Sequence, residues 1–330
     1  MSNVSEGIFK TIFNPQSIAV FGASSNEAKS GTRYLKALIE VGYPGRLYPI
    51  NPKDQEILGQ KAYASIRDCP EPVDYAMFCV PAHHVPDLVE DCGANGIKAM
   101  QLFTAGFKES GEADGIELEN RMVRIARRHG IRIIGPNCIG IYCPESRIPY
   151  GMGASPMEPG NVGFLSQSGG HAGRLVFGGF MQGIRFSKVI SYGNGCDLDA
   201  VDFMKFLGSD QNTGVIGAYI EGMENVRPFY ELTRRISKEK PIVIQEHFDR
   251  MTDLFGREAF QSFFTELLDL GEKSKTVFPL IWPPETSTPE GISLRLKLIE
   301  KGLTVYPSAR RAARAISNVI QYKKGKSERI

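Results

Sequence analysis

The chain has 330 residues, 42% of them hydrophobic, which is enough apolar material for two globular cores. Its 39 basic and 37 acidic residues nearly cancel, so we expect no nucleic-acid partner and no attraction to a membrane surface. The six cysteines form no C-x-x-C pair, which favours a reducing, cytoplasmic setting. No signal peptide or membrane-spanning run is apparent in the sequence, so neither secretion nor membrane insertion is expected.

Short apolar runs alternate with amphipathic stretches through the first part of the chain. Runs of this kind are typical of strands buried on both faces of a parallel sheet. A helical pattern over Asp114–His129 stops at Gly130. We therefore predict an α/β domain over residues 1–148, with strands at Ser17–Phe21, Leu47–Ile50, Tyr75–Val80, Ala99–Thr104 and Arg132–Ile134.

A stretch rich in proline and glycine, Pro144–Gly160, shows no periodicity and predicts an interdomain linker over residues 149–160. The alternating pattern then resumes, which predicts a second α/β domain over residues 161–330. Its strands are expected at Val162–Leu165, Ser187–Ser191, Val215–Tyr219 and Ile242–Gln245, and its helices at Gly170–Met181, Ala200–Leu207 and Val226–Ser237.

The pattern after Gln245 is less regular. Two short strands are predicted at Thr276–Ile281 and Leu303–Tyr306, and two amphipathic helices at Glu290–Glu300 and Ser308–Tyr322. These pieces amount to a truncated third α/β segment.

Two glycine loops follow apolar runs, the first at Gly22–Ala28 and the second at Ser166–Gly170. Backbone N–H groups of such small residues can approach a phosphate at a helix N-terminus. The first loop lacks the G-x-G-x-x-G spacing, and the next strand ends at Asn51-Pro-Lys53 without an acidic residue for a ribose diol. These two features disfavour the alternative of a nicotinamide-dependent oxidoreductase. The Lys53 ammonium instead suits a phosphate, unless it is only a solvated lysine after a turn.

Several stretches of the chain together resemble the α-type portion of the NDP-forming acyl-CoA synthetases, relatives of the succinyl-CoA synthetase α-subunit. They keep the family's order along the chain. The matching stretches are Ile18-Ala-Val-Phe-Gly-Ala-Ser24, Leu47-Tyr-Pro-Ile-Asn-Pro-Lys53, Val80-Pro-Ala82, Thr104-Ala-Gly-Phe107, Ile134-Gly-Pro-Asn-Cys138, Gly163-Phe-Leu-Ser-Gln-Ser-Gly169, Tyr192-Gly-Asn-Gly195 and Tyr219-Ile-Glu-Gly222.

The resemblance implies a Rossmann-like CoA-binding domain followed by a flavodoxin-like ligase domain. It implies that CoA is bound by Gly22, Ser24, Ser25, Asn51, Lys53, Val80, Pro81, Thr104, Ala105, Gly106 and Asn137. Asn137 would lie near the CoA thiol, or would be a plain turn asparagine. The resemblance also implies that a phosphoryl or acyl phosphate group is held by Ser166, Gln167, Ser168, Gly169 and Gly170.

The family's phosphorylated histidine has no match at its expected place, in a glycine-rich loop after the strand ending at Gln245. Glu221 matches the glutamate that orients that histidine, a role in which a carboxylate stabilises the charged ring. His171 and His247 are the candidate substitutes. The adjacent pair His83-His84 has no further ligands to complete a metal site, and we assign it to the surface.

Two hypotheses follow from the resemblance. The chain is either the CoA-binding subunit of a heteromeric ligase, or a non-catalytic CoA- or acyl-CoA-binding scaffold or regulator that has lost the phosphohistidine. A ligase would need a partner chain of the nucleotide-grasp (β-type) class carrying Mg-ATP or Mg-GTP, and we expect a homo- or hetero-oligomer. Arg147 and Arg174 are candidates to pair with a second carboxylate or a sulfonate on the acyl group, unless either is only a surface cation.

Overall fold

The computed structural model describes residues 6–153, 155–223 and 226–246, together with 280–281, 292, 296, 299–300, 305–306 and 311. The chain forms two compact units, Met1–Val215 and Ile216–Ile330. The first half of unit 1 contains α1 (Glu6–Phe13), β1 (Ser17–Phe21), α2 (Ser30–Glu40), β2 (Arg46–Ile50), β5 (Tyr75–Phe78), α3 (Val85–Ala94), β6 (Ala99–Leu102), α4 (Ala113–His129) and β7 (Arg132–Ile134).

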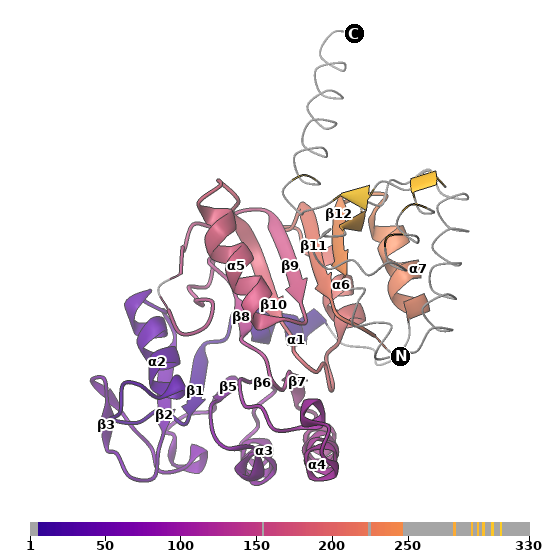
Figure 1. Ribbon diagram of the computed structural model, residues 1–330. Coiled ribbons are helices and arrows are strands. Elements are labelled where there is room, and N and C mark those ends of the chain that lie inside the picture. The colour runs from indigo at the N-terminus through magenta and orange to yellow at the C-terminus, as the bar shows by residue number, and fades with distance from the viewer. Residues whose placement is uncertain are drawn as a thin grey trace. The chain divides into compact units, whose positions relative to one another are not determined.

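These strands form a parallel sheet in the order β2-β1-β5-β6-β7, which confirms the predicted Rossmann-like fold (Figure 1). Strands β1, β5 and β6 are buried along their whole length, as expected of apolar runs covered on both faces. The chain order reverses between β1 and β5. The carboxyl ends of these two strands therefore flank a topological switch point, where open α/β sheets bind ligands.

Helices cover both faces of this sheet. Successive side chains of a strand point to opposite faces, and Ala19 and Phe21 of β1 belong to a buried cluster with Val89 of α3 and Met122 of α4. The rings of Phe21 and Phe78 stack within it, with centroids 4.5 Å apart. Figure 1 shows α3 and α4 together on one side of the sheet and α2 on the other.

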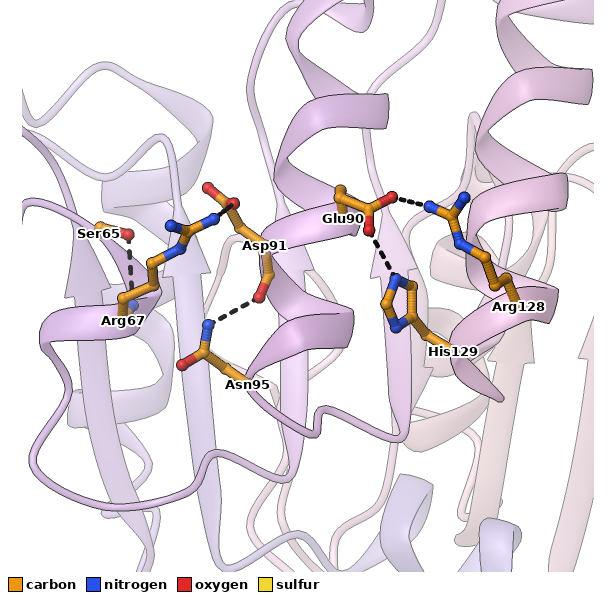
Figure 2. Close-up of polar contacts among 7 residues, drawn as sticks. All are labelled: Ser65, Arg67, Glu90, Asp91, Asn95, Arg128 and His129. Atoms are coloured by element: carbon orange, nitrogen blue, oxygen red, sulfur yellow. Dashed lines mark hydrogen bonds and ion pairs between the residues drawn. The ribbon is translucent and has the colours of Figure 1, made fainter.

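Charged side chains connect α3 to its neighbours on the outside of the domain. Figure 2 shows the Glu90 carboxylate between Arg128 and His129 of α4, with 2.8 Å between Glu90 Oε1 and His129 Nε2. The hydrogen bond from His129 is the main cause that holds the pKa of Glu90 below its usual value. Arg67 pairs in the same way with Asp91 of α3. His129 is the last residue of α4, as predicted, and its ring lies against Gly93 of α3.

The second half of unit 1 contains β8 (Gly140–Tyr142), β9 (Val162–Ser166), α5 (Gly169–Phe180), β10 (Phe186–Ser191) and α6 (Ala200–Ser209). Strands β9 and β10 are parallel, and β8 pairs with β10 in the antiparallel direction. The sequence did not predict β8, because its place in the sheet depends on antiparallel pairing with the distant strand β10. The N-terminal helix α1 packs on α6, where the rings of Phe9 and Phe206 stack with centroids 4.4 Å apart.

Unit 2 contains α7 (Val226–Ile236) and the parallel strands β11 (Val215–Ile220), which starts at the unit boundary, β12 (Ile242–Glu246), β13 (Leu280–Ile281) and β14 (Val305–Tyr306). All four strands overlap runs predicted from the sequence. The helices predicted over 290–300 and 308–322 fall mostly outside the described residues. The described positions Ile292, Leu296, Ile299, Glu300 and Arg311 are helical.

A hairpin and three short helical turns were not predicted, because each is too short for periodicity. The hairpin joins β3 (Glu56–Ile57) to β4 (Gln60–Lys61), and its turn residues Leu58 and Gly59 have φ of 52° and 73°, as a type I′ turn requires. The 3₁₀ turns are Ile66–Asp68, Ala82–His84 and Lys108–Ser110.

The exposed pair His83-His84 lies in the second of these 3₁₀ turns, which agrees with its predicted place on the surface. Among the described residues, no group of His, Cys, Asp and Glu side chains is arranged to hold a metal ion. No helix in the described part of the chain combines the length and the apolar character needed to cross a bilayer.

Candidate functional site

A cavity of about 460 Å³ lies in unit 1, at the carboxyl ends of β5, β6 and β7 and at the N-termini of α2 and α5. It is lined from both halves of the unit. Among its walls are seven predicted site residues: Val80, Pro81, Thr104, Ala105, Asn137, Gly169 and Gly170. The remaining walls are Ser30, Cys79, Phe103, Cys138 and Ile139.

The switch point beside this cavity requires glycine. Gly22 has a φ of +88°, and a Cβ atom there would lie 2.3 Å from the Cys79 carbonyl oxygen. A Cβ atom on Gly31 of α2 would lie 2.4 Å from the Gly22 carbonyl carbon. Because only glycine permits these approaches, the end of β1 packs directly against the end of β5 and the start of α2.

The first glycine loop is held by side chains of its own domain. The Ser24 backbone N–H donates to Thr32 Oγ1 at 2.9 Å, and the Ser25 backbone N–H donates to Asp54 Oδ2 at 2.8 Å. Both predicted donors therefore have protein acceptors for their backbone N–H groups. The hydroxyls of the two serines are the groups left to contact a ligand at this loop. Ser24 Oγ also accepts from the Asn26 backbone N–H at 3.3 Å.

Asp54 is a site residue that sequence reasoning missed. Asn51 Oδ1 accepts from the backbone N–H of Lys53 at 2.8 Å and of Asp54 at 3.2 Å, which turns the chain back toward the first loop. Asn51 Nδ2 donates to the same Asp54 oxygen that holds Ser25. Lys53 is exposed beside this turn. The signal in the sequence was the turn-forming pair Asn51-Pro52, which brings an acid to the loop four residues after β2 ends.

Strands β5 and β6 end two residues earlier than predicted, at Phe78 and Leu102, so the segments after them form loops. Thr104 Oγ1 donates to the Val80 carbonyl at 2.8 Å, and the Asn137 backbone N–H donates to the Thr104 carbonyl at 2.9 Å. These bonds join the three strand ends in series. Asn137 has a φ of +56°, a conformation that asparagine tolerates better than most residues.

Glu109 connects two of the loops around the cavity, and it was also missed. Its Oε1 accepts from the backbone N–H of predicted site residue Gly106 at 2.7 Å, and its Oε2 accepts from Asn194 Nδ2 at 2.5 Å. Asn194 Nδ2 also donates to Oε2 of the buried Glu119 at 2.9 Å. Partial burial raises the pKa of Glu109, but the hydrogen bonds from Asn194 and Gly106 outweigh it, and the net pKa lies below its usual value.

The second glycine loop is closed by its own serines. Ser166 is fully buried, and its Oγ donates to the Ser168 carbonyl at 2.7 Å. Ser168 caps α5 by accepting from the His171 backbone N–H at 3.3 Å. The helix N-terminus then faces the cavity through Gly169 and Gly170, where the helix dipole favours negative charge. The half-buried Gln167 lies in the same loop.

Tyr150, in the stretch predicted as a linker, holds the start of α5. Its hydroxyl donates to the Gly169 carbonyl at 2.7 Å, and burial raises the pKa of the phenol above its ordinary value. Gly169 in turn lies against Ile139, because a Cβ atom there would come within 2.5 Å of Ile139 Cγ1. The domain limits themselves remain a prediction.

None of the candidate catalytic residues is among the described residues that line the cavity. His171 is half-buried in the first turn of α5 and is not among the residues that line the cavity. Glu221 directly follows β11 in unit 2, at the carboxyl end of that strand. His247 lies outside the described residues. The catalytic roles of all three remain predictions.

Four of the five lining residues that were not predicted could have been found from the sequence, and one could not. Cys79, Phe103, Cys138 and Ile139 adjoin predicted positions, so the rule that ligands bind at the carboxyl ends of parallel strands could have found them. Ser30 reaches the cavity only through the packing of α2. Burial raises the pKa of both the Cys79 and Cys138 thiols to about 12, so both are neutral near pH 7.

Two family models match the chain. A CoA binding domain matches residues 16–144, and a succinyl-CoA ligase like flavodoxin domain matches residues 159–247. Together they cover both glycine loops and every residue that lines the cavity.

Among the similar proteins, the α subunit of acetate–CoA ligase [ADP-forming] I from Pyrococcus furiosus is 38% identical over 239 residues, which are 71% of this chain and 52% of the relative. The acetate–CoA ligase [ADP-forming] I of Archaeoglobus fulgidus is 38% identical over 235 residues, 71% of this chain and 34% of the relative. The chain thus spans about half the length of the relatives that are α subunits.

A solved structure shares the fold. The dinucleotide forming acetyl-coenzyme A synthetase 1 of Candidatus Korarchaeum cryptofilum, in complex with phosphate and ADP, aligns with a TM-score of 0.71 at 33% identity. The alignment covers 92% of this chain and 60% of that chain.

Proposed function

The chain belongs to the NDP-forming acyl-CoA synthetase family, and on that premise we propose that it is the CoA-binding, α-like subunit of a heteromeric ligase. Such a ligase forms an acyl-CoA from a carboxylate, CoA and a nucleoside triphosphate. One observation carries the proposal: the strand ends of the CoA-binding domain and the glycine loop of the ligase-type domain line the same cavity.

The residues of the site suit different parts of CoA. Lys53 and the hydroxyls of Ser24 and Ser25 bind its phosphates at the end of β1, where a cation and small donors fit an anion. The pantetheine arm runs past Val80-Pro81 and Thr104–Gly106. The thiol then reaches Asn137, opposite the backbone N–H groups of Gly169 and Gly170.

The second glycine loop, Ser166–Gly170, is the part of the site that suits a phosphoryl or acyl phosphate group. Ser166 and Ser168 fix its shape, and the N-terminus of α5 supplies partial positive charge without a formal cation. An acyl phosphate held there presents its carbonyl carbon to the CoA thiol. The thiol sulfur bonds to that carbon, inorganic phosphate leaves, and the thiol proton passes to solvent or to the leaving phosphate.

A nucleotide-grasp partner of the β type, carrying Mg-ATP or Mg-GTP, completes the ligase. One observation supports a partner: the similar Pyrococcus protein is an α subunit. Glu221 orients the phosphorylated histidine of the reaction, with His171 or His247 as the candidate histidine of this chain. The free cysteines Cys92 and Cys138 are buried as thiols, which supports a reducing, cytoplasmic setting.

Calorimetric titration of the full chain with CoA tests the proposal, with NADPH as the competing ligand. We expect CoA to bind and a Lys53→Ala variant to bind it at least about tenfold more weakly, because a phosphate loses its cation. Lys205→Ala, which removes an exposed lysine of α6, is the matched control and leaves binding unchanged. Preference for NADPH, or no binding of CoA, would overturn the proposal.

A non-catalytic CoA- or acyl-CoA-binding function is the second candidate, and one observation favours it: no histidine follows His247 in the sequence. The two candidates differ in whether the chain turns over an acyl phosphate. Incubation with acetyl phosphate and CoA, followed by chromatography for acetyl-CoA, separates them. Acetyl-CoA above the uncatalysed level supports the ligase subunit, whereas CoA binding without turnover supports the scaffold or regulator.

A further inference from the structure

Among the residues that the structure describes, none that lines the cavity is Lys, Arg, His, Asp or Glu, so these walls carry no formal charge. Their polar side chains are neutral: Ser30, Thr104, Asn137 and the protonated thiols of Cys79 and Cys138. The positive charge that these residues offer is only the partial charge at the N-terminus of α5, so a carboxylate that entered the cavity would lose water without gaining an ion pair from them.

The two arginines that could have supplied a cation lie elsewhere. Arg147 Nη1 donates to the Val41 carbonyl, just past the end of α2, at 2.9 Å. Arg174 is exposed on α5, and neither arginine is among the lining residues. The expectation that one of them pairs with a second carboxylate therefore gains no support from the cavity.

Tyr34 of α2 contacts two residues of the apolar wall, Phe103 and Ile139. Its ring meets the Phe103 ring edge to face, with centroids 5.8 Å apart and an interplanar angle of 64°. Its hydroxyl donates to the Ile139 carbonyl at 2.8 Å. Tyr34 is 2% exposed, and burial raises the pKa of its phenol, so the hydroxyl stays a donor.

A second buried side chain fixes the same wall. Gln101 Nε2 donates to the Ile139 carbonyl at 3.3 Å, while its Oε1 accepts from the Ile141 N–H at 3.2 Å and from the Tyr75 hydroxyl at 2.9 Å. Gln101 and Tyr75 are 2% and 0% exposed. Because the Ile139 carbonyl accepts from both Tyr34 and Gln101, the wall made by Phe103 and Ile139 cannot move back without breaking these hydrogen bonds.

We propose that Phe103, held in place by Tyr34, is the residue that limits acyl size, and that the site accepts short, uncharged acyl groups and rejects acyl groups carrying a second carboxylate. This inference rests on the proposed function, because it assumes that the cavity takes the thiol end of CoA. The cavity of about 460 Å³ then takes that end together with the acyl group. Phe103 selects by size, and the neutral walls select by charge.

The test is calorimetric titration of the full chain with CoA, acetyl-CoA, phenylacetyl-CoA and succinyl-CoA. We expect acetyl-CoA to bind about as well as CoA, and the phenylacetyl and succinyl derivatives to bind at least about tenfold more weakly than acetyl-CoA. Phe103→Ala should reduce the penalty on phenylacetyl-CoA at least about tenfold. The same variant should still reject succinyl-CoA, because it adds space but no cation.

Controls separate a specificity role from a structural one. Phe103→Leu is a milder variant that keeps a large apolar side chain, and it should shift the phenylacetyl-to-acetyl ratio in the same direction if Phe103→Ala fails to fold. Tyr34→Phe removes the hydroxyl that holds Ile139 and should relax the same ratio by a smaller factor. Phe177→Ala, which truncates a 41% exposed ring on α5, should leave every ratio unchanged.

Different outcomes overturn different statements. If CoA binds but the Phe103 variants leave the phenylacetyl-to-acetyl ratio within about twofold of the wild type, the role of Phe103 is wrong while the proposed function stands. If succinyl-CoA binds as tightly as acetyl-CoA, selection by charge is wrong. If no CoA derivative binds, the proposed function fails and this inference fails with it.

Discussion

The carboxyl edge of the first sheet and the outer face of α3 and α4 are held together by different kinds of contact. At the carboxyl edge, neutral backbone groups meet at distances that only glycine permits, as at Gly22 and Gly193. On the outer face, exposed ion pairs such as Arg121–Asp87 and those drawn in Figure 2 connect the helices. Solvent screens the second kind of contact and leaves the first unchanged. The ligand-facing edge should therefore tolerate substitution far less well than the outer face.

Gly22→Ala should have the largest effect. The new Cβ atom meets the Cys79 carbonyl oxygen at a φ that side chains rarely adopt, so we expect a loss of more than about 2 kcal/mol of unfolding free energy, together with CoA binding. Denaturant unfolding and calorimetry measure the two losses. Gly96→Ala is the matched control, since Gly96 has a φ of +79° but no atom within 4 Å of its added Cβ. Equal losses in the two variants would show that the close approach to β5 contributes nothing.

Gly170→Leu should separate binding from stability. Gly170 lines the cavity and has open space around an added Cβ atom, so we expect the protein to fold normally while CoA affinity falls about tenfold, or about 1.4 kcal/mol. Gly178→Leu makes the same change in the same helix, also into open space but away from the cavity walls. A Gly170 variant that binds CoA as tightly as the Gly178 variant would contradict a ligand at the N-terminus of α5.

Glu109 should make the carboxyl edge sensitive to acid. Its pKa in the folded chain lies below its ordinary value of 4.5, so the stability that it contributes is fully present above pH 4.5 and is lost as the pH falls through the lower folded pKa. Glu109→Gln keeps an oxygen acceptor for the Gly106 N–H but does not titrate. Its unfolding free energy should fall less steeply below pH 4.5 than that of the wild type, as thermal unfolding between pH 3 and pH 7 would show.

Glu112→Gln is the control for this acid effect, because Glu112 precedes α4 without making a side-chain capping hydrogen bond. It should follow the wild-type pH dependence. If the unfolding free energy of Glu109→Gln also follows the wild-type pH dependence, the charge of Glu109 does not stabilise the contact between the Gly106 and Asn194 loops.

Arg121→Ala should have the smallest effect. Arg121 Nη2 and Asp87 Oδ1 are 2.6 Å apart, but their side chains are 50% and 75% exposed. We expect a change of no more than about 0.5 kcal/mol in unfolding free energy and no change in CoA affinity. A loss as large as that of Gly22→Ala would show that the outer face is as constrained as the carboxyl edge.

Much of the fold and part of the site were predictable because their signals are local. The buried strands appear as apolar runs, and the residues just after them, such as Val80 and Asn137, lie at the ligand-binding edge of any parallel sheet. Asp54 was not predicted, because its carboxylate reaches Ser25 only after the chain turns at Asn51. Glu109 and Tyr150 were missed for the same reason, since each bonds to a loop from another part of the chain.

The sequence by itself determined the strand and helix pattern, the two glycine loops and the family resemblance, because hydrophobic periodicity and turn residues act over a few neighbouring positions. Only the tertiary structure decided which loops share a cavity and what its walls are made of. The hydrogen bond from Tyr34 to Ile139 joins residues 105 positions apart, and the pairing of β8 with β10 joins residues as distant as Tyr142 and Val189. Contacts of this kind depend on packing and steric fit, which no local pattern of residues records.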